Sequence, residues 1–206
     1  NAKEHLFDAH VMMRECRPTS GVRIDVIPAM ATLCLKDGPC LETGRKSVST
    51  VLQLSQVTKS YGASAALDRV DFSLPDNAYI SLLGPSGSGK TTLLRVIAGF
   101  EEPDAGSILF HGQRLDGVEP HDRGIGFVFQ NFALFPHLSV AENVAFGLRN
   151  RKVDPVTDAR VLAKRIQDML SLVGLKGFDD RAVTQISGGQ RQRVALARTL
   201  VPEPKM

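Results

Sequence analysis

The pattern of apolar and polar residues predicts strands in the first part of the chain. Apolar side chains occupy every second position over residues 68–74, with polar ones between them, which is the period of a half-buried strand. The apolar positions are Val70, Phe72 and Leu74, and the polar ones are Arg69, Asp71 and Ser73. Apolar stretches at 51–58, 107–110 and 125–129 predict further strands. The run 79–83 has no polar face and predicts a strand buried on both sides.

Later in the chain the apolar period becomes helical. Residues 90–98 predict a helix that ends at Gly99. Ser139 and Glu142 form a capping box, which predicts a helix running to about residue 149. A longer helix is expected with its apolar face at Val161, Leu162, Ile166, Met169, Leu170 and Val173, followed by Gly174, and another from Ser187 to Pro202. This order predicts an α/β core interrupted by a helical insertion.

Residues 1–48 show neither of these periods and no helix caps. We therefore expect a poorly ordered extension of unknown role. All three cysteines lie in it, without a C-x-x-C pair, which indicates free thiols rather than a disulfide framework or a zinc site. The net charge of +3 does not indicate nucleic-acid binding, and no apolar run approaches the roughly 20 residues that span a bilayer.

A glycine-rich loop follows the apolar run 79–83 and precedes the helix at 90–98. It matches the pattern G-x-x-x-x-G-K-[ST] over Gly84, Pro85, Ser86, Gly87, Ser88, Gly89, Lys90 and Thr91, with Thr92 next. Glycines allow backbone N–H groups to approach a polyphosphate, and a helix N-terminus favours an anion. In such a loop Lys90 reaches the β- and γ-phosphates and the Thr91 hydroxyl ligates Mg²⁺. The sequence therefore predicts a site for a nucleoside triphosphate and Mg²⁺, which by itself leaves many NTPase classes open.

A second group of small residues begins the predicted helix at 187. Ser187, Gly188, Gly189 and Gln190 closely resemble the signature motif of ABC ATPases, although Ile186 stands where that family usually has Leu. The resemblance covers about residues 50–206. It implies a P-loop NTPase core of RecA-like, ABC type with N-terminal antiparallel strands and a helical subdomain. In that family the signature motif faces the ATP held by the other subunit of a dimer.

The resemblance also assigns roles to two single residues. Tyr61 stands where the family has an aromatic residue that stacks on adenine. Gln130 stands where the family has a glutamine that contacts Mg²⁺ and the attacking water. Together with Lys90, Gln130 is the candidate catalytic residue, and Thr91 and Gln130 are the candidate metal ligands. The expected domains are a nucleotide-binding core over 49–130, a helical subdomain over 131–190 that ends at the signature motif, and a return helix into the core over 191–206.

Residues 124–149 resemble, more narrowly, the ATPases of importers for polyamines, ferric iron, sulfate, phosphonates and sugars. This implies a peripheral subunit on the cytoplasmic face of the cell membrane, which pairs with itself and with a transmembrane permease. Phe132, Leu134 and Phe135 are the candidate docking patch for that permease.

Three residues of the family's catalytic site have no counterpart before Met206: the Walker B aspartate, the adjacent glutamate and a later histidine. We therefore expect that the cassette is truncated and that residues 1–206 alone do not hydrolyse ATP, since phosphoryl transfer needs a held Mg²⁺ and a positioned nucleophile. Two alternatives are a soluble ABC ATPase of DNA repair or translation and a non-catalytic nucleotide-binding module.

Overall fold

The computed structural model describes residues 23–28, 49–149 and 158–206. The chain divides between Arg123 and Gly124 into two compact units, and each is described by itself. No helix in the described ranges has the length and apolar character to cross a bilayer.

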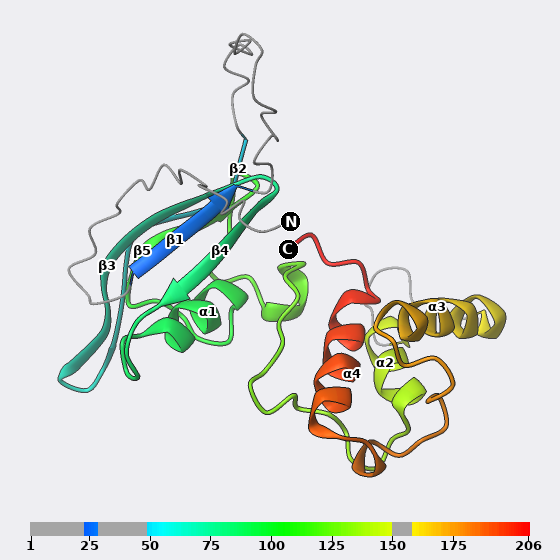
Figure 1. Ribbon diagram of the computed structural model, residues 1–206. Coiled ribbons are helices and arrows are strands. Elements are labelled where there is room, and N and C mark those ends of the chain that lie inside the picture. The colour runs from blue at the N-terminus through cyan, green and yellow to red at the C-terminus, as the bar shows by residue number, and fades with distance from the viewer. Residues whose placement is uncertain (1–22, 29–48, 150–157) are drawn as a thin grey trace, which may run out of the picture. The chain divides into compact units, whose positions relative to one another are not determined.

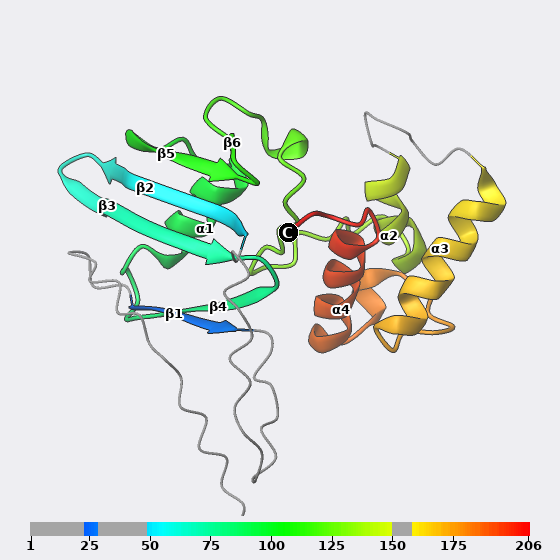
Figure 2. The same cartoon turned by 90° about the horizontal axis from the view of Figure 1, so that it is seen from above.

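A four-stranded antiparallel sheet dominates the first unit (Figures 1 and 2). Its order is β3 (Ser64–Pro75), β2 (Thr50–Tyr61), β5 (Ala105–Phe110) and β6 (Gln113–Arg114). The predicted alternation in β3 is confirmed, because Val70, Phe72 and Leu74 are buried while Arg69, Asp71 and Ser73 are not. The sheet therefore presents one apolar face to the core.

A second, two-stranded sheet lies apart from the first and joins β1 (Arg23–Pro28) to β4 (Ala78–Leu83) in antiparallel register. The register runs from Arg23 opposite Leu83 to Pro28 opposite Ala78. The apolar pattern did not predict β1. The other residues of the expected poorly ordered extension, 1–22 and 29–48, lie outside the described ranges. A local period is a weak signal for a strand this short.

The prediction that residues 79–83 are buried on both faces is also wrong. Side chains along β4 alternate between half-buried and exposed, with Tyr79 73% and Leu83 51% exposed. Among the described residues β4 pairs only with β1, and an isolated two-stranded sheet buries little side-chain surface. Composition alone could not reveal how many neighbours the strand has.

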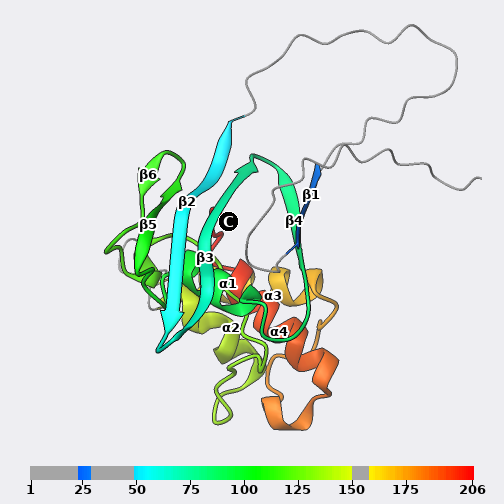
Figure 3. The ribbon, with the colours of Figure 1, turned by 90° about the vertical axis from the view of Figure 1, so that its left-hand side faces the viewer.

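Helix α1 (Lys90–Ala98) has the bounds that the sequence predicts and lies between the two sheets in Figures 2 and 3. It buries Leu93, Val96 and Ile97. It ends at Gly99, whose φ of 87° is the left-handed conformation typical of a helix C-terminus. The short 3₁₀ helix η1 (Pro120–Asp122) precedes Arg123, the last residue of this unit.

The predicted strand at 125–129 is absent, and residues 125–129 have no regular secondary structure. Their backbone contacts come instead from the C-terminal end of the described chain. Gly126 N donates to Met206 O at 2.6 Å, and Lys205 N donates to Gly124 O at 2.8 Å. None of residues 125–129 is fully buried, and a short apolar run does not by itself specify a strand.

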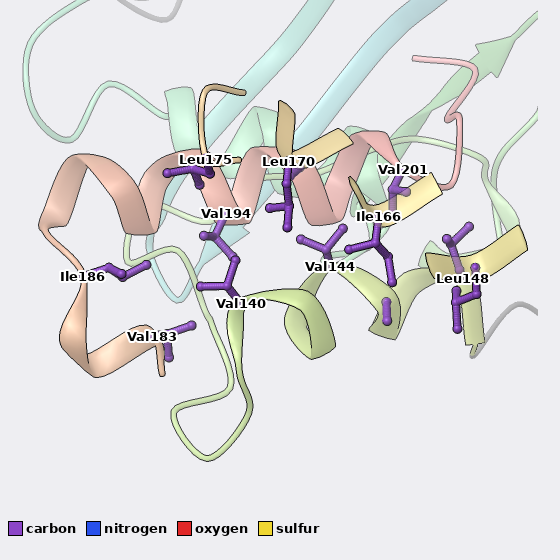
Figure 4. Close-up of a cluster of buried hydrophobic side chains, with 13 residues drawn as sticks. Val140, Val144, Leu148, Ile166, Leu170, Leu175, Val183, Ile186, Val194 and Val201 are labelled. Atoms are coloured by element: carbon purple, nitrogen blue, oxygen red, sulfur yellow. The ribbon is translucent and has the colours of Figure 1, made fainter. Parts of the chain in front are cut away.

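The second unit contains three α-helices and one 3₁₀ helix in the described ranges: α2 (Val140–Arg149), α3 (Ala159–Leu172), η2 (Val183–Gln185) and α4 (Gly188–Leu200). Val144 of α2, Leu170 of α3 and Val194 of α4 belong to one buried apolar cluster (Figure 4). The predicted apolar face of α3 is confirmed except at Val161, which is 44% exposed. The sequence-based division placed residues 191–206 with the α/β core, whereas in the structure α4 packs within this helical unit.

Candidate functional site

The glycine-rich loop joins β4 to α1 in the first unit. Gly89, the residue before α1, has a φ of 87° and offers no side-chain cap to the helix. A Cβ at Gly89 would lie 2.3 Å from the carbonyl oxygen of Ala66 in β3, so the loop passes close to the sheet only because this residue is glycine. The first turn of α1 carries no acidic residue. The helix N-terminus therefore remains suited to an anion.

Lys90 points back into this loop. Its Nζ donates to the carbonyl oxygens of Gly84 at 2.9 Å and Pro85 at 2.6 Å, and it lies 3.1 Å from Ser88 Oγ. These partners are neutral, so an anionic phosphate oxygen in the loop would make a stronger hydrogen bond with the ammonium group. Ser86, Gly87 and Thr91 are exposed around it. The loop thus gathers a cation, exposed hydroxyl groups and a helix N-terminus in one place.

Tyr61 ends β2, the strand that pairs with β3. Its hydroxyl group donates to a carboxylate oxygen of Glu101, which also pairs with Arg95 of α1 at 3.2 Å. The ring remains 50% exposed. Glu101 therefore anchors the polar tip of Tyr61 while much of its aromatic surface stays accessible for stacking.

A neighbouring ion pair supports the same corner of the first unit. Lys59 Nζ lies 3.0 Å from Asp104 and 5.9 Å from the centroid of the Tyr61 ring. Hydrogen bonds from Lys59 and from the Ser60 backbone lower the pKa of Asp104. The sequence analysis singled out neither Glu101 nor Asp104, because each meets its partner across 40 or more residues of sequence.

Residues 187–190 begin α4 in the second unit with a complete capping box. Ser187 N donates to Gln190 Oε1 at 2.8 Å, and Gln190 N donates to Ser187 Oγ at 3.3 Å. Gly188 and Gly189 are exposed, and nothing lies within 4 Å of a Cβ placed at Gly189. Ile186 is buried in the apolar cluster of this unit. The two glycines therefore leave the start of α4 open to a ligand or to another chain.

Gln130 also lies in the second unit, exposed at the start of a turn. Two residues of the turn that follows it, Phe132 and Ala133, have φ values of 66° and 45°, which non-glycine residues seldom adopt. Arg198 of α4 donates to the carbonyl oxygens of both residues, at 3.0 and 2.7 Å. Sequence reasoning did not single out Arg198, which lies 65 residues from Ala133.

A pocket of about 280 Å³ lies beside this turn. It is lined by Asn131, Phe132, Leu134, Pro136, Val183, Thr184 and Arg191. Two members of the predicted docking patch, Phe132 and Leu134, thus line a concave surface. The third, Phe135, packs against Phe146 with ring centroids 4.5 Å apart.

Sequence comparison finds a large set of similar proteins. The family model described as ABC transporter matches residues 67–206. A probable sulfate/thiosulfate import ATP-binding protein of Chlorella vulgaris is 52% identical over 153 residues, which cover 74% of this chain and 63% of that protein. A spermidine/putrescine import ATP-binding protein of Pseudomonas aeruginosa is 48% identical over 159 residues, covering 75% of this chain and 43% of the relative. The chain thus spans about half the length of such relatives.

Solved structures with the same fold are also ATP-binding cassettes. A dimeric cassette in a post-hydrolysis state, bound to ADP and Pi, superposes with a TM-score of 0.63 at 31% identity, over 74% of this chain and 70% of that chain. The cbiO1 protein of Clostridium perfringens, part of the ABC transporter complex cbiONQ, gives a TM-score of 0.62 at 29% identity, over 76% of this chain and 63% of that one. The chain therefore belongs to the ABC transporter family and has the P-loop fold of its ATP-binding cassettes.

Proposed function

We propose that this chain is the ATP-binding subunit of an importer, and that it binds MgATP through residues 84–92. The geometry of the phosphate loop carries the proposal. Lys90 is held inside the loop by neutral oxygens that a phosphate can replace, at a helix N-terminus without a side-chain cap. The relatives are import ATP-binding proteins for sulfate or thiosulfate and for spermidine or putrescine, which supports import rather than a soluble function.

Each predicted site residue has a role in this proposal. Lys90 binds the terminal phosphates, the Tyr61 ring stacks on the adenine, and Gln130 orients the attacking water. Stacking of an aromatic ring on a base is worth about 1–3 kcal/mol. The anchored hydroxyl group and exposed ring of Tyr61 suit this role.

The residues also fit a magnesium ion. Mg²⁺ prefers hard oxygen ligands and keeps several waters when it binds a nucleotide. The Thr91 hydroxyl group is exposed in the first turn of α1, and Gln130 offers an exposed amide. When bound, the ion would neutralise charge on the phosphates. Thr91 would be one ligand of the ion, and the resemblance to the family assigns Gln130 as a second.

A second copy of the chain and a permease are the proposed partners. The open start of α4, with Gly188 and Gly189 exposed, suits contact with an ATP molecule held by the other copy. The pocket beside Phe132 and Leu134 suits a protruding element of a membrane permease. The subunit would accordingly work at the cytoplasmic face of the membrane.

Titration with a fluorescent ATP analogue in the presence of Mg²⁺ tests the proposal. Lys90→Ala should weaken binding roughly 10- to 100-fold, because it removes charge-assisted contacts to the phosphates. Lys164→Ala, which removes an exposed lysine of α3 in the second unit, is the matched control and should bind as the wild type does. Equal affinity of wild type and Lys90→Ala would refute the assignment. Phosphate release from the same samples tests the expectation that residues 1–206 do not turn over ATP alone.

A further inference from the structure

The turn after Gln130 is held in an unfavourable backbone conformation by polar contacts from two helices. Phe132 and Ala133 both have positive φ, and neither is glycine. Each such residue typically costs enough to shift a local equilibrium severalfold toward other conformations. Something in the surrounding structure must therefore compensate.

Arg198 supplies one set of compensating contacts. Its two terminal nitrogens donate to two successive carbonyl oxygens, of Ala133 at 2.7 Å and of Phe132 at 3.0 Å. Its guanidinium group also lies 5.6 Å from the centroid of the Phe135 ring. The planar fork of arginine matches two neighbouring acceptors, which a single ammonium group does not.

Asn143 of α2 supplies the other set and is fully buried. Its amide accepts from Phe135 N at 2.8 Å and donates to Phe135 O at 3.1 Å. Phe132 N donates to Phe129 O, which closes the turn. The segment 132–135 is thus fixed to α4 at Phe132 and Ala133 and to α2 at Phe135.

The position of Arg198 on its helix connects these contacts with the candidate signature motif. Arg198 lies in the last turn of α4, the helix that begins with Ser187, Gly188 and Gly189. The ion pairs among the described residues do not include Arg198, and burial lowers the pKa of its guanidinium group. A half-buried arginine that bonds only neutral carbonyl oxygens is costly to desolvate. Its hydrogen bonds to the carbonyl oxygens of Phe132 and Ala133 offset that desolvation cost.

We propose that Arg198 is a positioning residue that fixes the turn after Gln130 to the signature helix α4, so that Gln130 and the start of α4 move together. The inference rests on the proposed function for the roles of Gln130 and of the signature motif. It assigns to Arg198 no contact with nucleotide. Movement of the pocket wall at Phe132 would then reach α4 through these hydrogen bonds.

Amide hydrogen exchange of the full chain tests the proposal, with the N–H groups of Phe132 and Phe135 as reporters. In Arg198→Gln both should exchange at least about tenfold faster, since two charge-assisted hydrogen bonds are lost. Amides of α3 should change less than about twofold, because Arg198 does not hold that helix. Arg198→Lys, which keeps the charge but not the fork, should give an intermediate acceleration. Arg193→Gln, an exposed arginine of the same helix, should behave as the wild type does.

Unchanged exchange at Phe132 and Phe135 in Arg198→Gln would overturn the proposal, and so would an equal acceleration throughout α2, α3 and α4, which indicates a purely structural role. If Arg198→Gln does not fold, Arg198→Lys is judged by the same criteria.

A nucleotide arm separates this proposal from the proposed function. MgATP should slow amide exchange at Phe132 in the wild type, and Arg198→Gln should lose that protection. The Kd of Arg198→Gln for MgATP should stay within about twofold of the wild-type value, because no described contact of Arg198 lies in the phosphate loop. Full protection in Arg198→Gln would contradict the inference. Failure of the wild type to bind MgATP would instead contradict the proposed function. The exchange rates measured without nucleotide would then still test whether Arg198 holds the turn at Phe132 and Ala133.

Discussion

Arginines that bind backbone carbonyl oxygens occur in both units. Arg123, 5% exposed, donates to the oxygens of Val96 and Ile97 at the end of α1 and to that of Val118. The carbonyl groups of Val96 and Ile97 lie in the last turn of α1, where Val96 O also accepts from Gly99 N at 3.2 Å, and a cation there complements the helix dipole. Burial lowers the pKa of Arg123, while nearby acidic residues, Asp116 foremost, act in the opposite direction. Arg123 thus fixes the far end of the helix that begins at the phosphate loop.

Gly99→Ala should destabilise the first unit by more than its backbone strain alone. The φ of +87° costs a residue with a Cβ about 1–2 kcal/mol. In addition, the new Cβ would lie 2.4 Å from Arg123 Nε, so the arginine would have to leave its carbonyl partners. Gly112→Ala is the control, because its φ is +76° and its Cβ would meet nothing within 4 Å. Urea unfolding should show the larger loss for Gly99→Ala, and equal losses would mean that Arg123 is displaced at no cost.

Glu142→Gln should remove part of the acid sensitivity of the second unit. Hydrogen bonds from the Ser139 backbone and hydroxyl group lower the pKa of Glu142 below its ordinary value of 4.5. A carboxylate with a lowered folded-state pKa contributes stability that is complete above 4.5 and is lost as the pH falls through the folded value. Glutamine can still complete the capping box but does not titrate.

Thermal unfolding between pH 7 and pH 3 measures this effect as the difference between wild type and Glu142→Gln. The difference should change only below about pH 4.5, the ordinary range of a glutamate. A constant difference in stability across this pH range would show that protonation of Glu142 does not affect the stability of the second unit.

Among the elements, α4 has three distinct regions. Its first residues form the capped candidate signature motif, its middle residues Val194 and Ala197 are buried, and its last turn carries Arg198. Thr199 Oγ also lies 3.3 Å from Phe127 O in the segment before Gln130. One helix therefore joins the candidate signature, the core of the second unit and the segment on both sides of Gln130.

Strand β1 supplies the second element-scale prediction. Because β1 pairs along the whole of β4, removing it would uncover backbone N–H and C=O groups beside the phosphate loop. Removing residues 1–28 should therefore lower solubility and the apparent affinity for MgATP, whereas removing residues 1–22 should preserve both. The pair differs only in β1. Equal behaviour of the two shortened chains in sedimentation and nucleotide titration would show that β1 contributes nothing to this edge.

At the scale of the whole molecule, the two compact units have separate apolar residues to bury. In the first unit these come from β2, β3, β5 and α1, and in the second from α2, α3, α4 and the residues near η2. Units with separate cores need not unfold together.

Two probes should therefore report different urea midpoints. Both tyrosines, Tyr61 and Tyr79, lie in the first unit and the chain has no tryptophan, so tyrosine fluorescence follows that unit alone. Helical ellipticity follows mainly α2, α3 and α4, and the two curves should separate. MgATP should raise the fluorescence midpoint by mass action on the folded first unit. Coincident curves would show that the units unfold as one.

The sequence by itself determined the features that depend on neighbours along the chain. The phosphate loop, the ends of α1, the capping box at Ser139 and the helix start at Ser187 all follow from glycine conformations and side chains within about four residues of a helix end. The alternation in β3 follows from a period of two. These signals depend only on residues close in sequence, so they can be recognised without knowledge of the fold.

Only the tertiary structure decided what those elements meet. It showed that residues 125–129 bond to the C-terminal end of the described chain instead of forming a strand, that β4 pairs with β1, and that Arg198 holds the turn at Phe132. The partners of Arg198 and Thr199 lie 65 to 72 residues away in sequence. Whether such contacts form depends on how the intervening helices pack, and neither composition nor periodicity records that packing.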